Sequence, residues 1–254
     1  MVKKNSLRVP TGISGFDELV QGGFPKNSSV LVCGGPGCGK TIFAMEFIIN
    51  GLNKFGEKGL YVSFEQKADS IKNQAKQFNW NIDALEKSGK MKLLSIPVAK
   101  ISRESLEEIK AYVKKEKIKR LVIDSLSTLV INAPIYTTPS ELAVKDVVGG
   151  NIIFSPPVIG DYVAKRFIYQ LIEDLAGLDC TTVLISEASE KGEYITRDTL
   201  SEFACDGVVI ISFESMGGNY SRSLIVRKMR GTKNDEDVHP VEISNKGIIV
   251  HKIE

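Results

Sequence analysis

A glycine-rich stretch near the amino end carries the most specific chemistry in this chain. Residues 34–41 read GGPGCGKT and fit the pattern GxxxxGK[ST], between an apolar run and a helical pattern. Glycines let a backbone wrap closely around a phosphate, and amide groups at a helix start point toward the anion. Lys40 can reach the outer phosphates and Thr41 can offer a hydroxyl to Mg²⁺. The predicted binding residues are Gly35, Pro36, Gly37, Cys38, Gly39, Lys40, Thr41 and Ile42.

Two acidic residues follow apolar runs that read as strands. Glu65 ends the run 59–65, and Asp124 ends the run 120–124. Ligands of open α/β sheets collect at the carboxyl ends of strands. We therefore expect Glu65, on a strand beside the one that feeds the glycine-rich loop, to activate a water for hydrolysis. We expect Asp124 to support Mg²⁺ together with Thr41. An acid that merely caps a strand or pairs with a lysine is the alternative for Glu65.

Lys228 and Arg230 form a second candidate group, far from the loop in sequence. They occupy alternate positions of a predicted strand and therefore point to the same side. Such a pair can neutralise a phosphate, and a neighbouring subunit can supply it during phosphoryl transfer. A cation pair on an exposed edge strand, which only discourages aggregation, is the alternative.

The elements that must position these residues alternate between strand and helix. Strand patterns cover 59–65, 91–96, 120–124 and 181–186, and helical patterns cover 69–78, 104–117 and the residues after Asp161, which we expect to cap its helix. Two hairpins follow, at 207–229 and 241–251. The order predicts an α/β fold with a mainly parallel twisted sheet, flanking helices and C-terminal antiparallel strands. We expect one domain, 1–254, with an irregular insertion at 131–160 around a short helix, 140–148.

Composition restricts the classes of function. The chain has 254 residues and a net charge of +2, so no global field attracts nucleic acid or anionic membrane. The four cysteines form no CxxC pair, which favours a reducing compartment over a disulfide framework. No apolar run is long enough to span a bilayer. We therefore expect a cytoplasmic protein.

Several motifs together resemble one family. They are TGISGFDEL at 11–19 with GGFP at 22–25, the loop at 34–41, YVSFE at 61–65, QFNW at 77–80, LVIDS at 121–125, KMRG at 228–231 with HP at 239–240, and KGI at 246–248. In this order they look like a single-domain KaiC-like ATPase of the RecA superfamily, over nearly the whole chain.

The resemblance implies a RecA-type core and a ring, expected to contain six subunits, with ATP and Mg²⁺ at subunit interfaces. Lys40, Glu65 and Asp124 then match the family's phosphate-binding lysine, water-activating acid and Mg²⁺-side acid. Lys228 and Arg230 match the residues that reach the neighbour's phosphate. An unidentified protein partner is also expected.

Two departures from the family pattern matter. The family often has two consecutive acids after the second strand, and here the second position is Gln66, a change expected to alter turnover while leaving the first acid in place. In the circadian clock protein of this family, an adjacent Ser and Thr become phosphorylated. The matching positions here are Glu202 and Phe203, and neither can accept a phosphate. Protein kinase activity at that pair is therefore not supported.

The leading hypothesis is a slowly ATP-hydrolysing regulatory or signalling ring, and two alternatives stay open. One is a DNA-binding ATPase related to RecA and its recombinase paralogues. The loop 187–202, where such proteins grip DNA, carries five acids against two basic residues, which weakens that hypothesis. The other is a nucleotide-gated scaffold with negligible hydrolysis.

Overall fold

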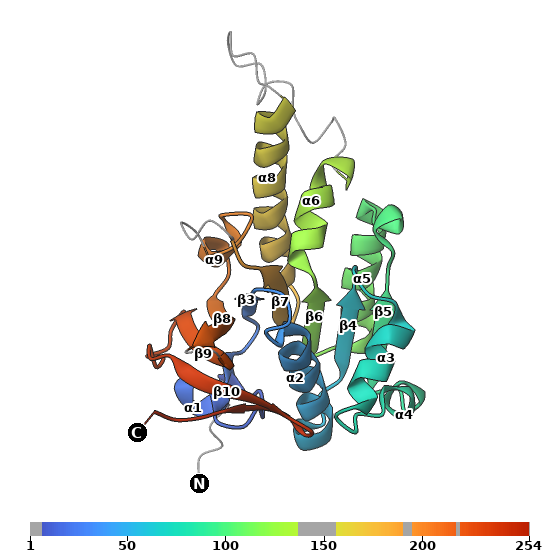
Figure 1. Ribbon diagram of the computed structural model, residues 1–254. Helices are drawn as coiled ribbons and strands as arrows, with labels where there is room; N and C mark the ends of the chain where they lie inside the picture. The colour runs from blue at the N-terminus through green and yellow to red at the C-terminus, as the bar shows by residue number, and fades with distance from the viewer. Residues whose placement is uncertain (1–6, 137–155, 190–194, 217–218, 254) are drawn as a thin grey trace.

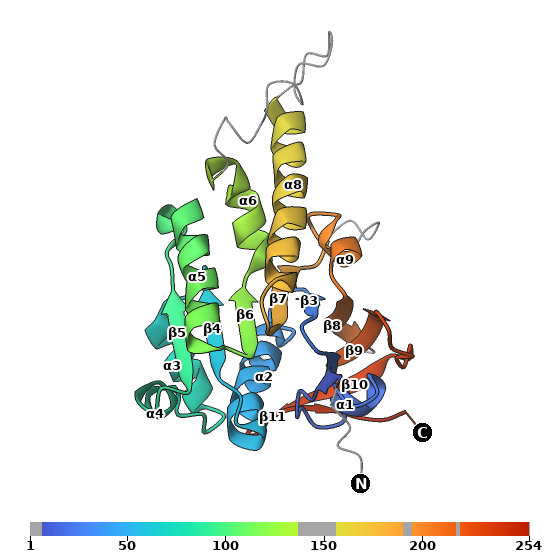
Figure 2. The ribbon, with the colours of Figure 1, turned by 180° about the vertical axis from the view of Figure 1, so that it is seen from behind.

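Buried apolar runs form the centre of a broad sheet in the computed structural model, which describes residues 7–136, 156–189, 195–216 and 219–253. Every residue of β3 (Ser29–Gly34), β4 (Gly59–Ser63) and β6 (Arg120–Asp124) is buried. Strands that are covered on both faces read as nearly continuous apolar runs, as these do. Figures 1 and 2 show helices on both faces of the sheet.

The described residues place nine strands in the order β11-β10-β9-β8-β3-β7-β6-β4-β5. Neighbours from β8 to β5 run parallel, whereas β8, β9, β10 and β11 pair antiparallel. This arrangement confirms the expected α/β fold with C-terminal antiparallel strands. The other strands are β5 (Met91–Ser95), β7 (Thr181–Glu187), β8 (Gly207–Met216), β9 (Asn219–Met229), β10 (His239–Ser244), β11 (Gly247–Val250), and a separate antiparallel pair, β1 (Arg8–Val9) with β2 (Phe24–Pro25).

Two apolar cores lie on opposite faces of the sheet. Alternate residues of a strand point to opposite faces. Val30 and Val32 of β3 therefore join the core that contains α2, whereas Leu31 and Cys33 join the core that contains α5, α6 and α8. The helices are α1 (Phe16–Leu19), α2 (Lys40–Phe55), α3 (Ala68–Lys76), α4 (Ile82–Lys87), α5 (Arg103–Glu116), α6 (Leu126–Tyr136), α8 (Pro156–Ala176) and α9 (Ser201–Ala204), with a 3₁₀ turn at Val98–Lys100.

The order of the strands corrects one expectation. The strand that leads to Glu65, β4, is not beside the strand that feeds the glycine-rich loop, because β7 and β6 lie between β4 and β3. Helical connections let consecutive strands skip positions in a parallel sheet, so neighbours along the chain need not be neighbours in space. All of these strands are parallel, however, so their carboxyl ends still open on the same edge.

The predicted irregular segment is helical at both of its described ends. α6 continues to Tyr136, and α8 begins at Pro156. Proline suits the first turn of a helix, where its missing amide hydrogen is not needed. Asp161 therefore lies inside α8 and does not cap it, contrary to the expectation. The short helix predicted at 140–148 lies outside the described residues. Figure 1 shows α6 and α8 rising side by side beyond the edge of the sheet.

Several elements were not anticipated from the sequence, among them α4 and the β1–β2 pair. The short helix α4 follows α3, and the Asn81 side chain accepts a hydrogen bond from the Ala84 amide, 3.0 Å away, at its start. The β1–β2 pair joins the segment before α1 to the segment after it. Among the described helices, none combines the length and the apolar character needed to cross a bilayer.

Candidate active site

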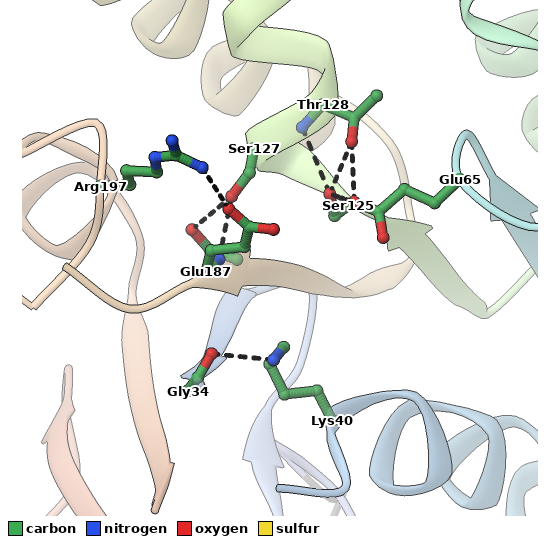
Figure 3. A network of polar contacts seen from close by, with 9 residues as sticks. Gly34, Lys40, Glu65, Ser125, Ser127, Thr128, Glu187 and Arg197 are labelled. Atoms are coloured by element: carbon green, nitrogen blue, oxygen red, sulfur yellow. Dashed lines mark hydrogen bonds and ion pairs between the residues drawn. The ribbon is translucent and has the colours of Figure 1, made fainter. Parts of the chain in front are cut away.

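The glycine-rich loop joins β3 to α2 at the carboxyl edge of the sheet. Gly37 and Gly39 have φ values of 72° and 115°, which residues with a side chain rarely adopt, and Gly39 directly precedes the helix. Lys40 folds back so that its Nζ donates to the carbonyl oxygens of Gly34 (2.8 Å) and Gly35 (2.7 Å), the first of which is drawn in Figure 3. The loop therefore holds one cation at its centre through its own backbone.

Asp124 lies next to Thr41 of this loop. Thr41 Oγ1 donates to Asp124 Oδ2 at 3.3 Å, and the Tyr61 hydroxyl donates to the same oxygen at 2.6 Å. Asp124 is 3% exposed, and burial raises the pKa of its carboxyl to about 6. A nearby cation would offset the cost of this buried carboxylate.

The donor set fits Mg²⁺ that is shared with a substrate. A hydroxyl and a carboxylate oxygen are the hard ligands that Mg²⁺ prefers, and it is usually bound through one or two carboxylates together with substrate phosphates. Among the described residues, no group of three or more His, Cys, Asp or Glu side chains is arranged to hold a metal ion by itself. Thr41 and Asp124 are the residues placed to hold the ion.

Glu65 reaches the same region from the end of β4. Thr128 Oγ1 donates to Glu65 Oε1 at 2.7 Å, and the Ser125 hydroxyl donates to the same oxygen (Figure 3). Both hydroxyls come from the start of α6. Within the described residues the acid is therefore hydrogen-bonded to hydroxyl groups, and no lysine there pairs with it as the alternative from the sequence supposed.

These groups line one cavity of about 680 Å³. Of the predicted residues, it includes Gly35, Pro36, Gly37, Lys40, Thr41, Glu65 and Asp124. The Cys38 side chain is buried away from the cavity, and Ile42 packs against the core on the α2 side. Gly39 is also absent from the cavity lining, and Cys38 Sγ accepts a long hydrogen bond from Lys40 Nζ at 3.9 Å.

Lys228 and Arg230 do not line this cavity in a single chain. Lys228 Nζ donates to the carbonyl oxygens of Glu202 (3.1 Å), Phe203 (3.0 Å) and Cys205 (2.6 Å) around α9. Arg230 donates to Asp206 Oδ1 (3.1 Å) and Phe203 O (3.2 Å). Burial and the neighbouring Arg230 lower the pKa of Lys228. Arg230 remains 57% exposed, so it is the more available of the two cations.

Glu202 and Phe203, the positions matched to the phosphorylated pair of the clock protein, differ in burial. Glu202 is 6% exposed and accepts hydrogen bonds from the Ile195 amide (3.2 Å) and the Thr196 hydroxyl. Phe203 is 59% exposed. The Glu202 carboxylate therefore holds the segment before α9 in place.

The site contains residues that sequence reasoning missed. Ser125 and Thr128 reach Glu65, and Tyr61 reaches Asp124 from the middle of a buried strand. A tyrosine inside an apolar run was the available signal, because a buried hydroxyl needs a hydrogen-bonding partner. Arg197 also lines the cavity and pairs with Glu187 at 2.8 Å (Figure 3).

A further missed contact comes from the antiparallel part of the sheet. Arg222 of β9 donates to the Gly37 carbonyl at 3.2 Å, and its guanidinium lies 4.1 Å from the centre of the Phe213 ring. No local motif marked Arg222, because this contact depends on β8 lying beside β3.

Comparisons with known proteins assign the chain to a family. The family model "ATPase: KaiC" matches residues 9–138 and 159–254, leaving a break inside the segment predicted as an insertion. The chain is 36% identical to a UPF0273 protein of Thermotoga maritima over 265 residues, covering 97% of each chain. It is 34% identical to the UPF0273 protein PH0284 of Pyrococcus horikoshii over 260 residues, covering 96% of this chain and 94% of the relative.

A solved structure gives the same result. The crystal structure of the KaiC-like protein PH0186 from Pyrococcus horikoshii superposes with a TM-score of 0.77 at 31% identity, covering 96% of this chain and 99% of that one. The matched family, the glycine-rich loop and the order of the strands agree with one another. The chain therefore belongs to the KaiC-like ATPase family.

Proposed function

We propose that this protein binds ATP with Mg²⁺ and hydrolyses it slowly, as a regulatory ring. The observation that carries the proposal is the convergence of Lys40, Glu65 and Asp124, from three different elements, on one cavity of about 680 Å³. A catalytic lysine, a water-activating acid and an Mg²⁺-side acid are the parts that phosphate-loop ATPases bring together.

Each residue has one task in this reaction. Lys40 exchanges the carbonyl oxygens of its own loop for oxygens of the outer phosphates. Glu65 accepts a proton from a water whose oxygen attacks the terminal phosphorus, and the bond from that phosphorus to the bridging oxygen breaks to leave ADP and phosphate. Thr41 and Asp124 would hold Mg²⁺, which neutralises charge on the outer phosphates when bound.

The most direct test of hydrolysis is phosphate release by the purified protein and by Glu65→Gln. The variant keeps the size of the side chain but cannot accept the proton, so we expect kcat to fall about 100-fold while ATP binding persists. Equal rates in the two proteins would favour a nucleotide-gated scaffold over an ATPase.

We also propose that Arg230, supported by Lys228, completes the site of a neighbouring subunit. Support comes from its position outside the cavity of its own chain and from its exposed guanidinium. Lys228 uses its three donors on two carbonyls of α9 and on that of Cys205 just after it, and thereby holds α9 beside Arg230. Native mass spectrometry with and without ATP tests this part: we expect a ring, of six subunits, with ATP present. A strict monomer at saturating ATP would contradict it.

A further inference from the structure

The side chain of Glu65 is fixed by a cluster at the start of α6, and the cluster begins with the backbone. The Phe64 amide donates to the Asp124 carbonyl at 2.7 Å, which extends the pairing of β4 with β6 by one step. Glu65 and Ser125, the next residues in each segment, are therefore brought side by side above the sheet.

Ser125 has two simultaneous contacts. Its Oγ accepts a hydrogen bond from the Thr128 amide at 3.2 Å, as the side chain of a helix N-cap does, and donates to Glu65 Oε1. Thr128 adds the second donor to the same oxygen, and the two hydroxyl oxygens lie 3.0 Å apart. A helix cap is thus extended by a carboxylate from a different strand.

The two oxygens of Glu65 are left in different situations. Oε1 receives both hydroxyls, which matches its two lone pairs, whereas Oε2 accepts no hydrogen bond from the described part of the chain. Glu65 lines the cavity together with Lys40 and Thr41. The hydroxyl pair therefore fixes the side chain through one oxygen and leaves the other for a water.

We infer that Ser125 and Thr128 are positioning residues for Glu65: they hold its carboxylate so that Oε2 receives the proton of the attacking water. The inference rests on the proposed ATPase function and adds two residues to it. It also links the geometry of catalysis to α6, the helix that runs from this cluster to Tyr136 and packs against α8. A base that is misplaced by about 1 Å loses much of its effect, so loss of one hydroxyl should be measurable.

Thr128 is the better residue to test, because Ser125 also caps the helix. Thr128→Val keeps the shape of the side chain and removes only the donor. We expect kcat to fall about tenfold, since hydrogen bonds to charged groups are among the stronger ones, while the KM for ATP changes less than twofold. Thr128→Ser restores the hydroxyl and should recover most of the rate, which a purely structural role of the methyl group would not allow.

Asn132→Ala serves as the matched control. Asn132 lies one turn later on α6, and its side chain donates to the Thr128 carbonyl at 2.7 Å, not to Glu65. The rate of this variant should stay within twofold of the native rate. If Thr128→Val retains the native kcat or exceeds it, or if Thr128→Ser fails to rescue a lowered kcat, the positioning role is wrong although the ATPase function stands. A native protein that releases no phosphate would overturn the proposed function and this inference with it.

Discussion

The glycine-rich loop and the Glu65 carboxylate line the same cavity but are held by different means. The loop is one turn between β3 and α2, and Lys40 is held by the carbonyls of that turn. Glu65 is held by side-chain hydroxyls from a separate helix. The loop side of the cavity is therefore built by backbone shape, whereas the Glu65 side is built by single hydroxyl groups. Variants at three places, Lys40, Glu46 and the Gly34–Gly35 pair, test the backbone-built side of this comparison.

We expect the largest effect at Lys40, the one charged side chain of the loop. Lys40→Ala removes the charge that faces the outer phosphates, and we expect ATP turnover to fall about 100-fold or more. Binding of a fluorescent ATP analogue should weaken in parallel. Lys115→Ala, an exposed lysine of α5, is the control and should behave like the native protein. Unchanged turnover in Lys40→Ala would contradict a catalytic role for the loop.

The next effect concerns Glu46, which attaches α2 to β11. Glu46 of α2 is 6% exposed, accepts a hydrogen bond from the Ile248 amide at 2.7 Å, and lies beside Asn50; Lys54 is the nearby cation. Burial raises the pKa of Glu46 to about 7. The folded state therefore binds this proton more tightly than the unfolded state, whose pKa is near 4.5. This contribution to stability is fully present below about pH 4.5 and is lost as the pH rises through about 7.

Glu46→Gln removes this titration and keeps an oxygen acceptor for the Ile248 amide. We expect the variant to be more stable than the native protein by about 3 kcal/mol at pH 8, with the difference disappearing near pH 4.5. Urea unfolding at several pH values measures it. A difference that does not vary with pH would show that Glu46 is not the titrating group.

We expect a smaller effect, on stability, that distinguishes Gly34 from the adjacent Gly35. A Cβ at Gly34 would lie 2.1 Å from the Ile211 carbonyl oxygen and 2.7 Å from Cys38 Sγ, whereas a Cβ at Gly35 would meet nothing within 4 Å. Gly34→Ala should therefore lower the free energy of unfolding by about 2 kcal/mol, and Gly35→Ala should leave it nearly unchanged. Equal stabilities would show that the backbone at Gly34 adjusts easily and that the loop side is not rigid.

The same contrast explains which features could be predicted from the sequence. The loop at 34–41 was predictable because all of its parts are adjacent in the chain. Strands such as β6 were predictable from their apolar runs, and Glu65 and Asp124 from their positions after such runs. None of these inferences needs a distant contact.

The missed contacts at the site depend on which elements become neighbours. The separation of β4 from β3 is set by the crossover connections, which no local pattern encodes. The contact of Thr128 with Glu65 requires β4 to lie beside β6, and the contact of Arg222 with the loop requires β8 to lie beside β3. Similarly, Lys228 contacts residues around α9, from which it is separated in the chain by most of the β8–β9 hairpin. Long-range pairing therefore limited the prediction of the site.

The central claim is that the loop and Glu65 act on one triphosphate. A crystal structure of the protein with Mg²⁺ and a nonhydrolysable ATP analogue tests it most directly. We predict a triphosphate against residues 37–41, Lys40 Nζ on its terminal phosphate, and Glu65 Oε2 facing a water in line with that phosphate. An empty loop, or a Glu65 carboxylate that faces away from the terminal phosphate in every subunit, would contradict the claim.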